Sequence, residues 1–470
     1  MKTDNERNAE IDQFVERHRT EIVRNICKLI EIRSVAEDNS TVQPYGTGCR
    51  KVLNKALEIS NSLGFETDNC DYYCGSASLY HSKDLQSIAF WGHLDVVPEG
   101  KGWNYPPFAP TLHQGYIVGR GAIDNKGPSV CALYALLFFK ENRYKLNYNY
   151  KVIFGTNEER DMSDVVYYLQ HRPVPLFSII ADSVFPVCFA EKGIIHAEVE
   201  FPIIDDSIIY MTGGSARNSV AGTAEAKLKK VPGTIIPNTE KGIIVEENRD
   251  YILVKATGVA MHASSPEGSV SAISVLSSYL GNIIQCKEMQ RILKIILNIT
   301  DSYDGSVFGI DYSDQVTGDL TCVAGVLEYA DGKITLTLDI RYPITTDVHK
   351  MISRLKKSCT NFGARIVSLT DSKPCYVDPN DNLVTVLNGF YNEFMKTNVP
   401  PYYEGGGSYA RKVPNSLAFG PILHNRKPKP NSLAKGGAHK TDESVCVDEL
   451  LLALKIYILT ILKLDNMTFK

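Results

Sequence analysis

Residues 91–98 have the sequence WGHLDVVP, and they directly follow an apolar run at residues 88–90. The apolar run predicts a buried strand that ends at this point. Because side chains alternate along an extended segment, His93 and Asp95 would point to the same side. A carboxylate behind an imidazole can hold a metal-binding histidine in one tautomer. A hydrogen-bonded histidine at a strand end is the commoner meaning of this pattern, so its interpretation depends on the rest of the chain.

The size and composition of the chain limit its class. With 470 residues it is too long for one ordinary core, so two or more domains are expected. Hydrophobic residues at 44% and charged residues at 22% are typical of soluble globular proteins. The net charge of −4, without a basic block, argues against a nucleic-acid partner.

Several features bear on where the protein works. The first seven residues are polar and lack the apolar core of a signal peptide. Eleven cysteines without a repeated spacing predict reduced thiols in a cytoplasmic protein. The most apolar segment, residues 450–464, is short and carries Lys455 and Lys463. It therefore predicts a helix packed in a core, and no membrane span is expected.

Three apolar strands in the first part of the chain each end next to an imidazole or acidic side chain. These side chains are His93, the adjacent pair Glu158 and Glu159, and Asp182, and Asp124 lies in a glycine-rich loop between them. Strands that alternate with helices predict an α/β fold, in which helices cover both faces of a mostly parallel sheet. Ligands bind such sheets outside the carboxyl ends of the strands, so we expect these side chains to converge.

The pattern changes beyond residue 193 to extended, alternating segments with helical stretches between them. Residues 330–332 (ADG) separate two such segments and are a strong hairpin signal. This α+β pattern predicts an inserted domain at residues 193–377. The two flanking parts, residues 1–192 and 378–470, would together form the α/β domain.

The candidate residues suit a metal site. Carboxylates gathered in a crevice repel one another, and divalent cations relieve that repulsion. Nitrogen and oxygen ligands without thiolate suit zinc, manganese or cobalt. In the adjacent pair, one glutamate can ligate metal while the other takes a proton from a metal-activated water and returns it to a leaving amine. A solvated turn is the commoner meaning of two adjacent glutamates.

The chain resembles the cocatalytic metallopeptidase family of aminoacylases, carboxypeptidase G-type enzymes and PepV-type dipeptidases. Five separated motifs carry this resemblance and together span nearly the whole chain. They are residues 92–98 (GHLDVVP), 119–128 (GRGAIDNKGP), 155–159 (GTNEE) and 181–193 (ADSVFPVCFAEKG), with His439 near the end.

The resemblance implies two divalent metal ions per chain, with zinc as the first choice and manganese or cobalt as alternatives. Asp124 would bridge the two ions. His93 and Asp182 would complete one site, and Glu159 and His439 would complete the other.

The resemblance also implies catalytic roles. Glu158 would be the general base, and Asp95 would orient His93. His262, in the segment 261–267 (MHASSPE), would stabilise the oxyanion that forms on the carbonyl oxygen.

The inserted domain is similar to the lid of that family. Arg341 would bind a substrate carboxylate through a bidentate contact, and an ordinary ion pair within the lid is an equal alternative. Asn218 would lie near the substrate. Residues 405–411 (GGGSYAR), with Gly407 and Ser408 as substrate-binding residues, indicate the PepV-type branch. In that branch an enlarged lid lets a monomer supply what dimeric relatives take from a partner subunit.

The chain departs from the family pattern at several positions. Arg160 and Asp161 follow the glutamate pair where a small residue and glycine are usual, Ala221 replaces a proline, and residues 423–426 (LHNR) lack the usual proline-glycine turn. None of them removes a predicted ligand.

The sequence therefore predicts a metal-dependent hydrolase that cleaves dipeptides with a free C-terminal carboxylate. Two alternatives share the motifs. One is an N-acyl-amino-acid deacylase or carboxypeptidase, and the other is a catalytically impaired binding protein that keeps the fold.

Overall fold

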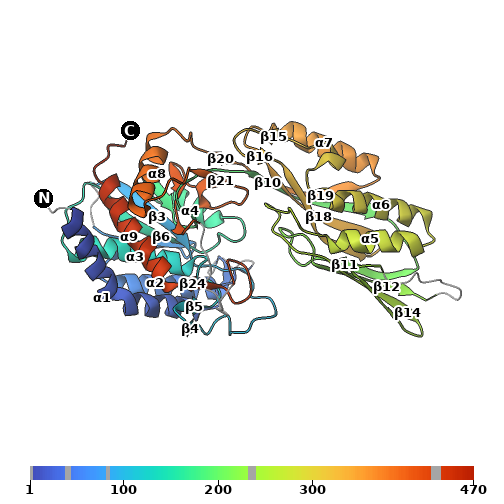
Figure 1. Cartoon of the computed structure of the whole chain (residues 1–470), viewed down its shortest axis with the longest axis horizontal. Coiled ribbons are helices and arrows are strands. Elements are labelled where there is room, and N and C mark those ends of the chain that lie inside the picture. The colour runs from blue at the N-terminus through green and yellow to red at the C-terminus, as the bar shows by residue number, and fades with distance from the viewer. Residues whose placement is uncertain (1–3, 38–43, 81–84, 231–239, 425–435, 470) are drawn as a thin grey trace. The chain divides into compact units, whose positions relative to one another are not determined.

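The computed structural model describes residues 4–37, 44–80, 85–230, 240–424 and 436–469. The chain forms two compact units (Figure 1). The first unit comprises Met1–Phe189, Val377–Tyr402 and Ser408–Lys470, and the second comprises Ala190–Tyr376 and Tyr403–Gly407.

The first unit contains a mixed sheet and six of the described α-helices. The helices are α1 (Asp4–Ile30), α2 (Gly46–Ser62), α3 (Lys126–Glu141), α4 (Ser163–His171), α8 (Asn382–Met395) and α9 (Val447–Leu464), and the 3-10 turn η2 covers Tyr409–Arg411. The sheet is formed by β1 (Glu66–Cys70), β2 (Cys74–Ser78), β3 (Ser87–His93), β6 (Asn149–Gly155), β7 (Phe177–Ile180), β9 (Cys188–Glu191), β20 (Cys375–Tyr376), β21 (Tyr402–Glu404) and β22 (Ser416–Ala418). The boundary between the units runs through β9 and β21, and the residues of β20 belong to the second unit. Shorter strands are β4 (Thr111–His113), β5 (Tyr116–Val118), β8 (Ser183–Val184), β23 (Pro421–Ile422) and β24 (Ser444–Cys446).

The centre of this sheet is parallel. The strand order is β1-β2-β6-β3-β7-β22-β9-β20, and β6, β3, β7 and β22 run in the same direction. The strands at both edges pair antiparallel. The predicted α/β fold with a mostly parallel sheet is therefore confirmed, and antiparallel edge strands extend it.

Both faces of the central strands are covered. In β3, Ile88 and Phe90 belong to the large core that α1, α3 and α9 share, whereas Ala89 and Trp91 pack in a second cluster with Tyr168 of α4. Since side chains alternate along a strand, burial on both faces makes the whole strand apolar, as its sequence is.

The second unit has one eight-stranded antiparallel sheet in the order β13-β14-β12-β11-β17-β18-β10-β19. Its strands are β10 (Gly193–Pro202), β11 (Ile208–Gly213), β12 (Thr223–Lys229), β13 (Ile243–Glu247), β14 (Tyr251–Thr257), β17 (Thr321–Ala330), β18 (Lys333–Tyr342) and β19 (Arg365–Ser372). The helices α5 (Ala272–Ile283), α6 (Lys287–Asp301) and α7 (Val348–Asn361) accompany it, with η1 (Ser306–Phe308), β15 (Ser313–Asp314) and β16 (Gly318–Asp319). The predicted inserted α+β fold is confirmed.

The hairpin signal at residues 330–332 joins β17 to β18. Ala330 pairs with Lys333, and the two residues between them have positive φ values, 51° at Asp331 and 71° at Gly332. Two left-handed residues in a two-residue loop match the right-handed twist of the strands.

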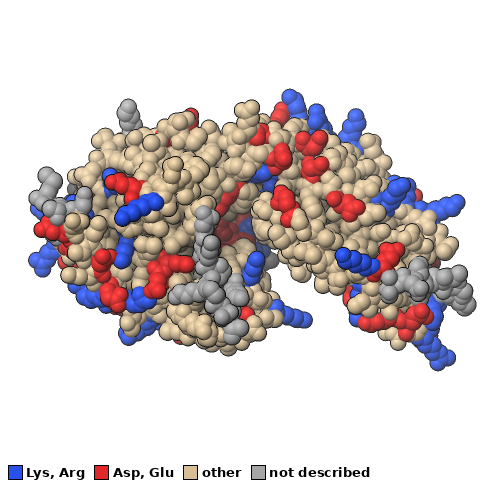
Figure 2. Space-filling view, viewed as in Figure 1, with Lys and Arg blue, Asp and Glu red and all other residues tan. Residues whose placement is uncertain are grey.

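The apolar segment at residues 450–464 is part of α9 and packs in the core of the first unit. Lys455 of this helix forms an ion pair with Asp12. Among the described residues, no helix combines the length and the hydropathy that a membrane span requires. Figure 2 shows Lys and Arg side chains interspersed with Asp and Glu on the face in view.

Candidate active site

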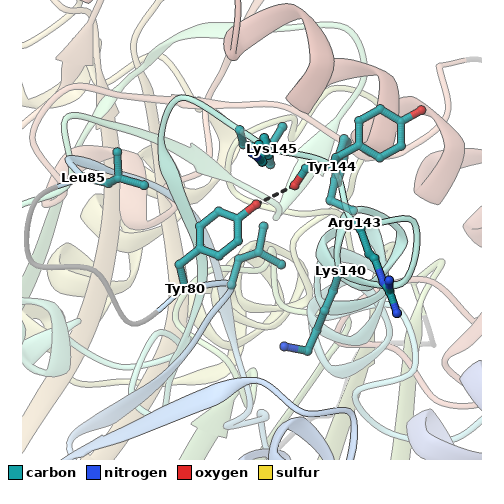
Figure 3. A pocket seen from close by; sticks show the side chains of 9 residues that line it. Tyr80, Leu85, Lys140, Arg143, Tyr144 and Lys145 are labelled. Carbon is teal, nitrogen blue, oxygen red and sulfur yellow. Dashed lines mark hydrogen bonds between the residues drawn. The ribbon is translucent and has the colours of Figure 1, made fainter. Parts of the chain in front are cut away.

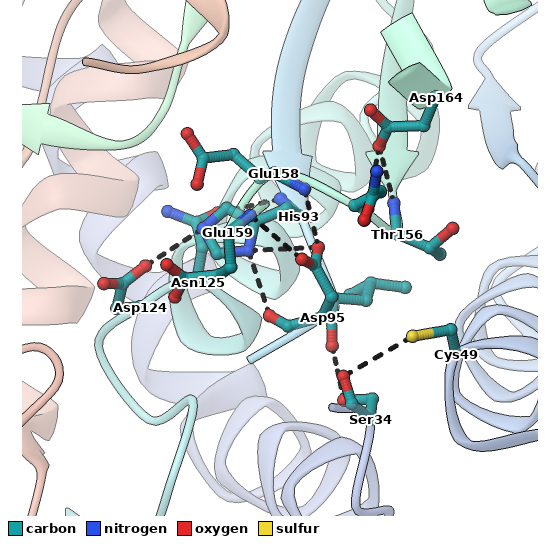
Figure 4. Close-up of polar contacts among 12 residues, drawn as sticks. Ser34, Cys49, His93, Asp95, Asp124, Asn125, Thr156, Glu158, Glu159 and Asp164 are labelled. Atoms are coloured by element: carbon teal, nitrogen blue, oxygen red, sulfur yellow. Dashed lines mark hydrogen bonds and ion pairs between the residues drawn. The ribbon is translucent and has the colours of Figure 1, made fainter. Parts of the chain in front are cut away.

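Three neighbouring parallel strands position the candidate residues. β3 ends at His93, β6 ends two residues before Asn157, and β7 ends just before Asp182. These ends lie at one edge of the sheet because the three strands run in the same direction. The loop before α3 brings Asp124 to the same edge (Figure 4).

Asp124 lies between two histidines. Its Oδ1 atom is 3.0 Å from Nε2 of His93, and its Oδ2 atom is 3.1 Å from Nε2 of His439. His93 Nε2 is also 3.4 Å from Asp182 Oδ2, and His439 Nε2 is 3.0 Å from Glu159 Oε1. The five residues predicted as metal ligands are thus brought together, and the two oxygens of one carboxylate face two separate groups.

Glu158 lies at the same cluster. Among the described residues, donor atoms of His93, Glu158 and Asp182 lie within 4.8 Å of one another, and so do those of His93, Asp124 and Glu159. Each set offers the nitrogen and oxygen atoms that divalent cations bind.

The pKa shifts show how burial and neighbouring charges change the protonation of these groups. Burial raises the pKa of Glu158 well above its usual value and raises the pKa of Glu159 to about 7. Burial alone would lower the pKa of His439, but the Glu159 and Asp124 carboxylates outweigh it and raise that pKa to about 11. Protons therefore compensate the crowded carboxylates, a role that divalent cations can take over. The donor set fits such ions.

Asp95 supports both sides of the cluster. Its main-chain oxygen accepts a hydrogen bond from Nδ1 of His93 at 3.0 Å, which leaves Nε2 facing the carboxylates. Its side-chain oxygens accept from the backbone N–H groups of Glu158 at 3.1 Å and Glu159 at 3.0 Å. The carboxylate of Asp95 is fully buried. It holds the backbone of the loop that carries the two glutamates, and it also lies behind His93.

The loop that carries Asp124 is held by Glu443. One oxygen of the Glu443 carboxylate accepts from the backbone N–H groups of Gly121, Ile123 and Asp124, and the other lies 2.8 Å from Arg120. Glu443 is completely buried. The sequence predictions did not include it, although its position four residues after His439 and the arginine in the GRG motif were available signals.

Asn125 connects the loop to the next strand. Its side-chain amide donates to Oδ1 of Asp182 at 2.8 Å and to the main-chain oxygen of Ala181 at 2.8 Å. It thereby fixes the carboxylate whose second oxygen faces His93. Asn125 was also missed, because a buried amide has no recognisable spacing.

Asp161, one of the departures from the family pattern, has contacts within its own turn. Its Oδ1 atom accepts from the side chain of Asn157 and from the backbone N–H of Ser163 at 3.0 Å. The aspartate thus stabilises the turn that leads into α4.

The predicted lid residues lie in the second unit. The backbone N–H of Ala263 donates to the main-chain oxygen of Asn218 at 2.9 Å, and Ser219 forms an antiparallel bridge with His262. The Nδ1 atom of His262 is 2.7 Å from the Ser264 hydroxyl. Asn218 and His262 are therefore neighbours, and their roles toward a substrate stay predictions.

Arg341 has partners inside the second unit. Its guanidinium contacts both carboxylate oxygens of the buried Asp339, and its Nη1 atom donates to the main-chain oxygen of Gly405 at 3.0 Å. The lid ion pair considered as an alternative is thus present, and binding of a substrate carboxylate stays a prediction.

Gly407 is exposed, whereas the hydroxyl of Ser408 is buried and accepts from the N–H of Ala410 at 3.2 Å.

A cavity of about 640 Å³ in the first unit lies apart from this cluster (Figure 3). Leu85 and Leu146, which precede β3 and β6, belong to its lining, so it lies at the opposite edge of the parallel strands. Among the residues that the structure describes, its polar lining consists of tyrosine, lysine and arginine side chains, with no carboxylate or imidazole.

Comparison with known proteins agrees with this architecture. Residues 89–463 match the model of peptidase family M20/M25/M40. The chain is 30% identical over 463 residues to "Putative dipeptidase YtjP" of Bacillus subtilis (strain 168), which covers 94% of this chain and 96% of that protein. It is 27% identical to "Putative dipeptidase MW1694" of Staphylococcus aureus (strain MW2), over 94% of this chain and 97% of that protein.

Among solved structures, human carnosine dipeptidase 1 is similar with a TM-score of 0.61 and 13% sequence identity, over 98% of this chain and 100% of that chain. At this identity the likeness shows the fold alone. The match to the family model covers more than half of the chain, so the chain belongs to peptidase family M20/M25/M40. It is therefore an enzyme of the metallopeptidase class.

Proposed function

We propose that this metallopeptidase hydrolyses the peptide bond of dipeptides that carry a free C-terminal carboxylate. It would use two divalent ions, with zinc as the first choice and manganese or cobalt as alternatives. His93 and Asp182 would hold one ion, Glu159 and His439 the other, and Asp124 would bridge them.

The single observation that carries this proposal is the position of Asp124 between the two histidines. Its two oxygens face His93 and His439 separately, at 3.0 and 3.1 Å. A carboxylate that served one ion would not need a second imidazole on its other oxygen. Two-metal sites use such a bridge to stabilise both the attacking and the leaving groups of a reaction.

Two divalent ions held there would act as Lewis acids toward the scissile carbonyl and the attacking water. Glu158 would take the proton from the attacking water and give it to the leaving amine. Its neighbour Glu159, which contacts His439, would hold an ion, so the two adjacent carboxylates would have separate tasks. Asp95 would keep both glutamates and His93 in these positions.

The substrate assignment draws on the relatives and on the second unit. Two relatives that align over nearly their full lengths are named as putative dipeptidases. We propose that the second unit acts as a lid, with His262 stabilising the oxyanion and Arg341 and Asn218 binding the substrate. Gly407 and Ser408 belong to the same proposal.

We further propose that the protein acts as a monomer in the cytoplasm, on small peptides alone. The eleven cysteines without a repeated spacing support a reducing compartment.

One assay tests the function. Purified protein is stripped with a chelator, reloaded with zinc, manganese or cobalt, and given dipeptides, tripeptides and N-acyl-amino acids of matched side chains. We expect hydrolysis of dipeptides, and a loss of about tenfold or more in kcat/KM when the C-terminal carboxylate is amidated, since a charged anchor is removed.

Each other outcome supports an alternative. Turnover of acyl-amino acids alone would make the protein a deacylase, and equal turnover of longer peptides would make it a carboxypeptidase. No turnover with any metal would favour the binding protein.

A further inference from the structure

We infer that Asp164 and Tyr409 are positioning residues for the catalytic pair Glu158 and Glu159. Neither residue belongs to the ligand cluster. They act on the backbone of the loop that carries the two glutamates, and the catalytic consequence rests on the proposed function.

Asp164 binds the first half of this loop. Its Oδ2 atom accepts hydrogen bonds from the backbone N–H groups of Thr156 at 2.8 Å and Asn157 at 3.0 Å (Figure 4). Its Oδ1 atom accepts from the N–H of Val165 at 2.8 Å, so the carboxylate is anchored at the start of α4. The side chain is fully buried, which makes these charge-assisted hydrogen bonds strong.

Asp95 binds the second half of the loop, through the N–H groups of Glu158 and Glu159. Two buried carboxylates therefore hold four consecutive N–H groups, those of residues 156–159. We call this arrangement the carboxylate clamp. A loop whose N–H groups are all directed inward by fixed acceptors has little freedom to move its side chains, and small displacements of a catalytic base are costly.

Tyr409 completes the clamp from a distant part of the chain. Its hydroxyl donates to Oδ2 of Asp164, the same oxygen that accepts from the loop, although the two residues are 245 positions apart. The tyrosine ring is fully buried and packs edge-on against Trp91 at 5.6 Å between ring centroids. The hydroxyl is a neutral donor that fixes the rotamer of the Asp164 carboxylate.

Gly155 shows how closely these groups approach the loop. A Cβ atom at this position would lie 1.7 Å from the hydroxyl of Tyr409 and 2.5 Å from Oδ2 of Asp164. Only glycine leaves room for both groups here. The glycine of the GTNEE motif is thus explained by the clamp.

A purely structural role for Tyr409 would change stability and leave the chemical step alone, and this difference can be measured. The test uses Tyr409→Phe, which removes the hydroxyl only. Tyr150→Phe is the matched control, because Tyr150 is a buried tyrosine at the other end of β6 whose hydroxyl donates to Ile461 O at 3.3 Å.

In the metal-loaded full chain we expect Tyr409→Phe to lower kcat about tenfold, the scale of lost support for a site residue. KM should stay within about twofold, and the bound metal should equal that of the wild type, because no ligand or substrate contact changes. Tyr150→Phe should keep the wild-type kcat. A wild-type kcat in Tyr409→Phe, or an equal fall in both variants, would overturn the inference.

A second measurement does not need activity. Hydrogen exchange of the metal-free protein should show the amides of residues 156–159 exchanging at least about tenfold faster in Tyr409→Phe than in the wild type or Tyr150→Phe. Unchanged exchange would overturn the clamp. If the wild type hydrolyses no peptide, the proposed function fails while this measurement still decides the inference. Asp164→Asn provides a second variant, with the same expected direction and a larger effect.

Discussion

His93 and His439 contact opposite oxygens of the same carboxylate, that of Asp124. One histidine ends the β3 strand, and the other lies near the end of the chain, just before β24. The loop that carries Asp124 is in turn held by Glu443, which follows His439 by four residues. The two halves of the cluster are therefore connected through a single carboxylate and its support.

Replacing Asp124 with alanine should abolish both metal sites, whereas His439→Ala should release mainly one ion. The reason is that Asp124 faces both histidines, whereas His439 faces the carboxylates of Asp124 and Glu159, which belong to the same proposed site. We expect the affinity for the first ion to fall by more than about 100-fold in Asp124→Ala, since changes outside the ligands alone cost roughly 10–100-fold. Metal content after dialysis, measured by mass spectrometry, checks this. Equal metal content in the two variants would contradict the bridging role.

The metal-free protein should lose stability as the pH rises from about 5 to 7. Burial raises the pKa of Glu159 from 4.5 to about 7, so its contribution is complete below pH 4.5 and is lost as the pH rises through 7. Thermal unfolding in chelator should show a larger fall for the wild type than for Glu159→Gln, whose amide does not titrate. The pKa of His439, which the Glu159 carboxylate raises, should fall in this variant. A fall of equal size in both would show that Glu159 is not responsible.

Glu443→Gln should destabilise the first unit strongly. The Arg120–Glu443 ion pair is almost completely buried, with side-chain exposures of 2% and 1%. Removing one charge leaves the guanidinium unpaired in the interior, which costs roughly 3–5 kcal/mol. Chemical unfolding measures this cost. Glu58→Gln, which removes an exposed partner of Lys55, is the control and should change little. A cost under about 1 kcal/mol would mean that the pair is not important for folding.

Arg341→Lys distinguishes the two roles considered for Arg341, binding of a substrate carboxylate and an ion pair with Asp339. If the guanidinium binds the substrate carboxylate, KM for dipeptides should rise about tenfold with kcat nearly unchanged, because lysine cannot make the bidentate contact. Arg365→Lys is the control, since Arg365 donates two hydrogen bonds to one oxygen of Glu200 in the same sheet. Unchanged KM with a lower unfolding midpoint would assign Arg341 to its ion pair with Asp339 alone.

Much of the fold and the cluster could be predicted because both follow from local patterns. Apolar strands buried on both faces are continuous apolar runs, and parallel strands bring their ends to one edge. His93, Glu158 and Asp182 are each close to such an end. Their convergence required no knowledge of tertiary contacts.

The supports of the cluster could not be predicted in this way. Asp164 and Glu443 act on N–H groups of loops that only the folded chain brings to them. Asp164 also lies in a short polar segment that resembles an ordinary helix start. The hairpin of β1 and β2 was missed because residues 66–78 are mostly polar or small, and β2 is placed by its pairing with β6, a strand far along the chain. The α6 helix was overlooked although its apolar residues have helical spacing.

The most direct test of the central claim is Glu158→Gln, measured for metal content and dipeptide hydrolysis in the same preparation. The amide has the shape of the carboxylate but cannot accept a proton, so hydrolysis should fall by at least about 100-fold while about two ions per chain remain bound. Loss of metal would mean that Glu158 is a ligand. Retained hydrolysis would mean that another group is the base.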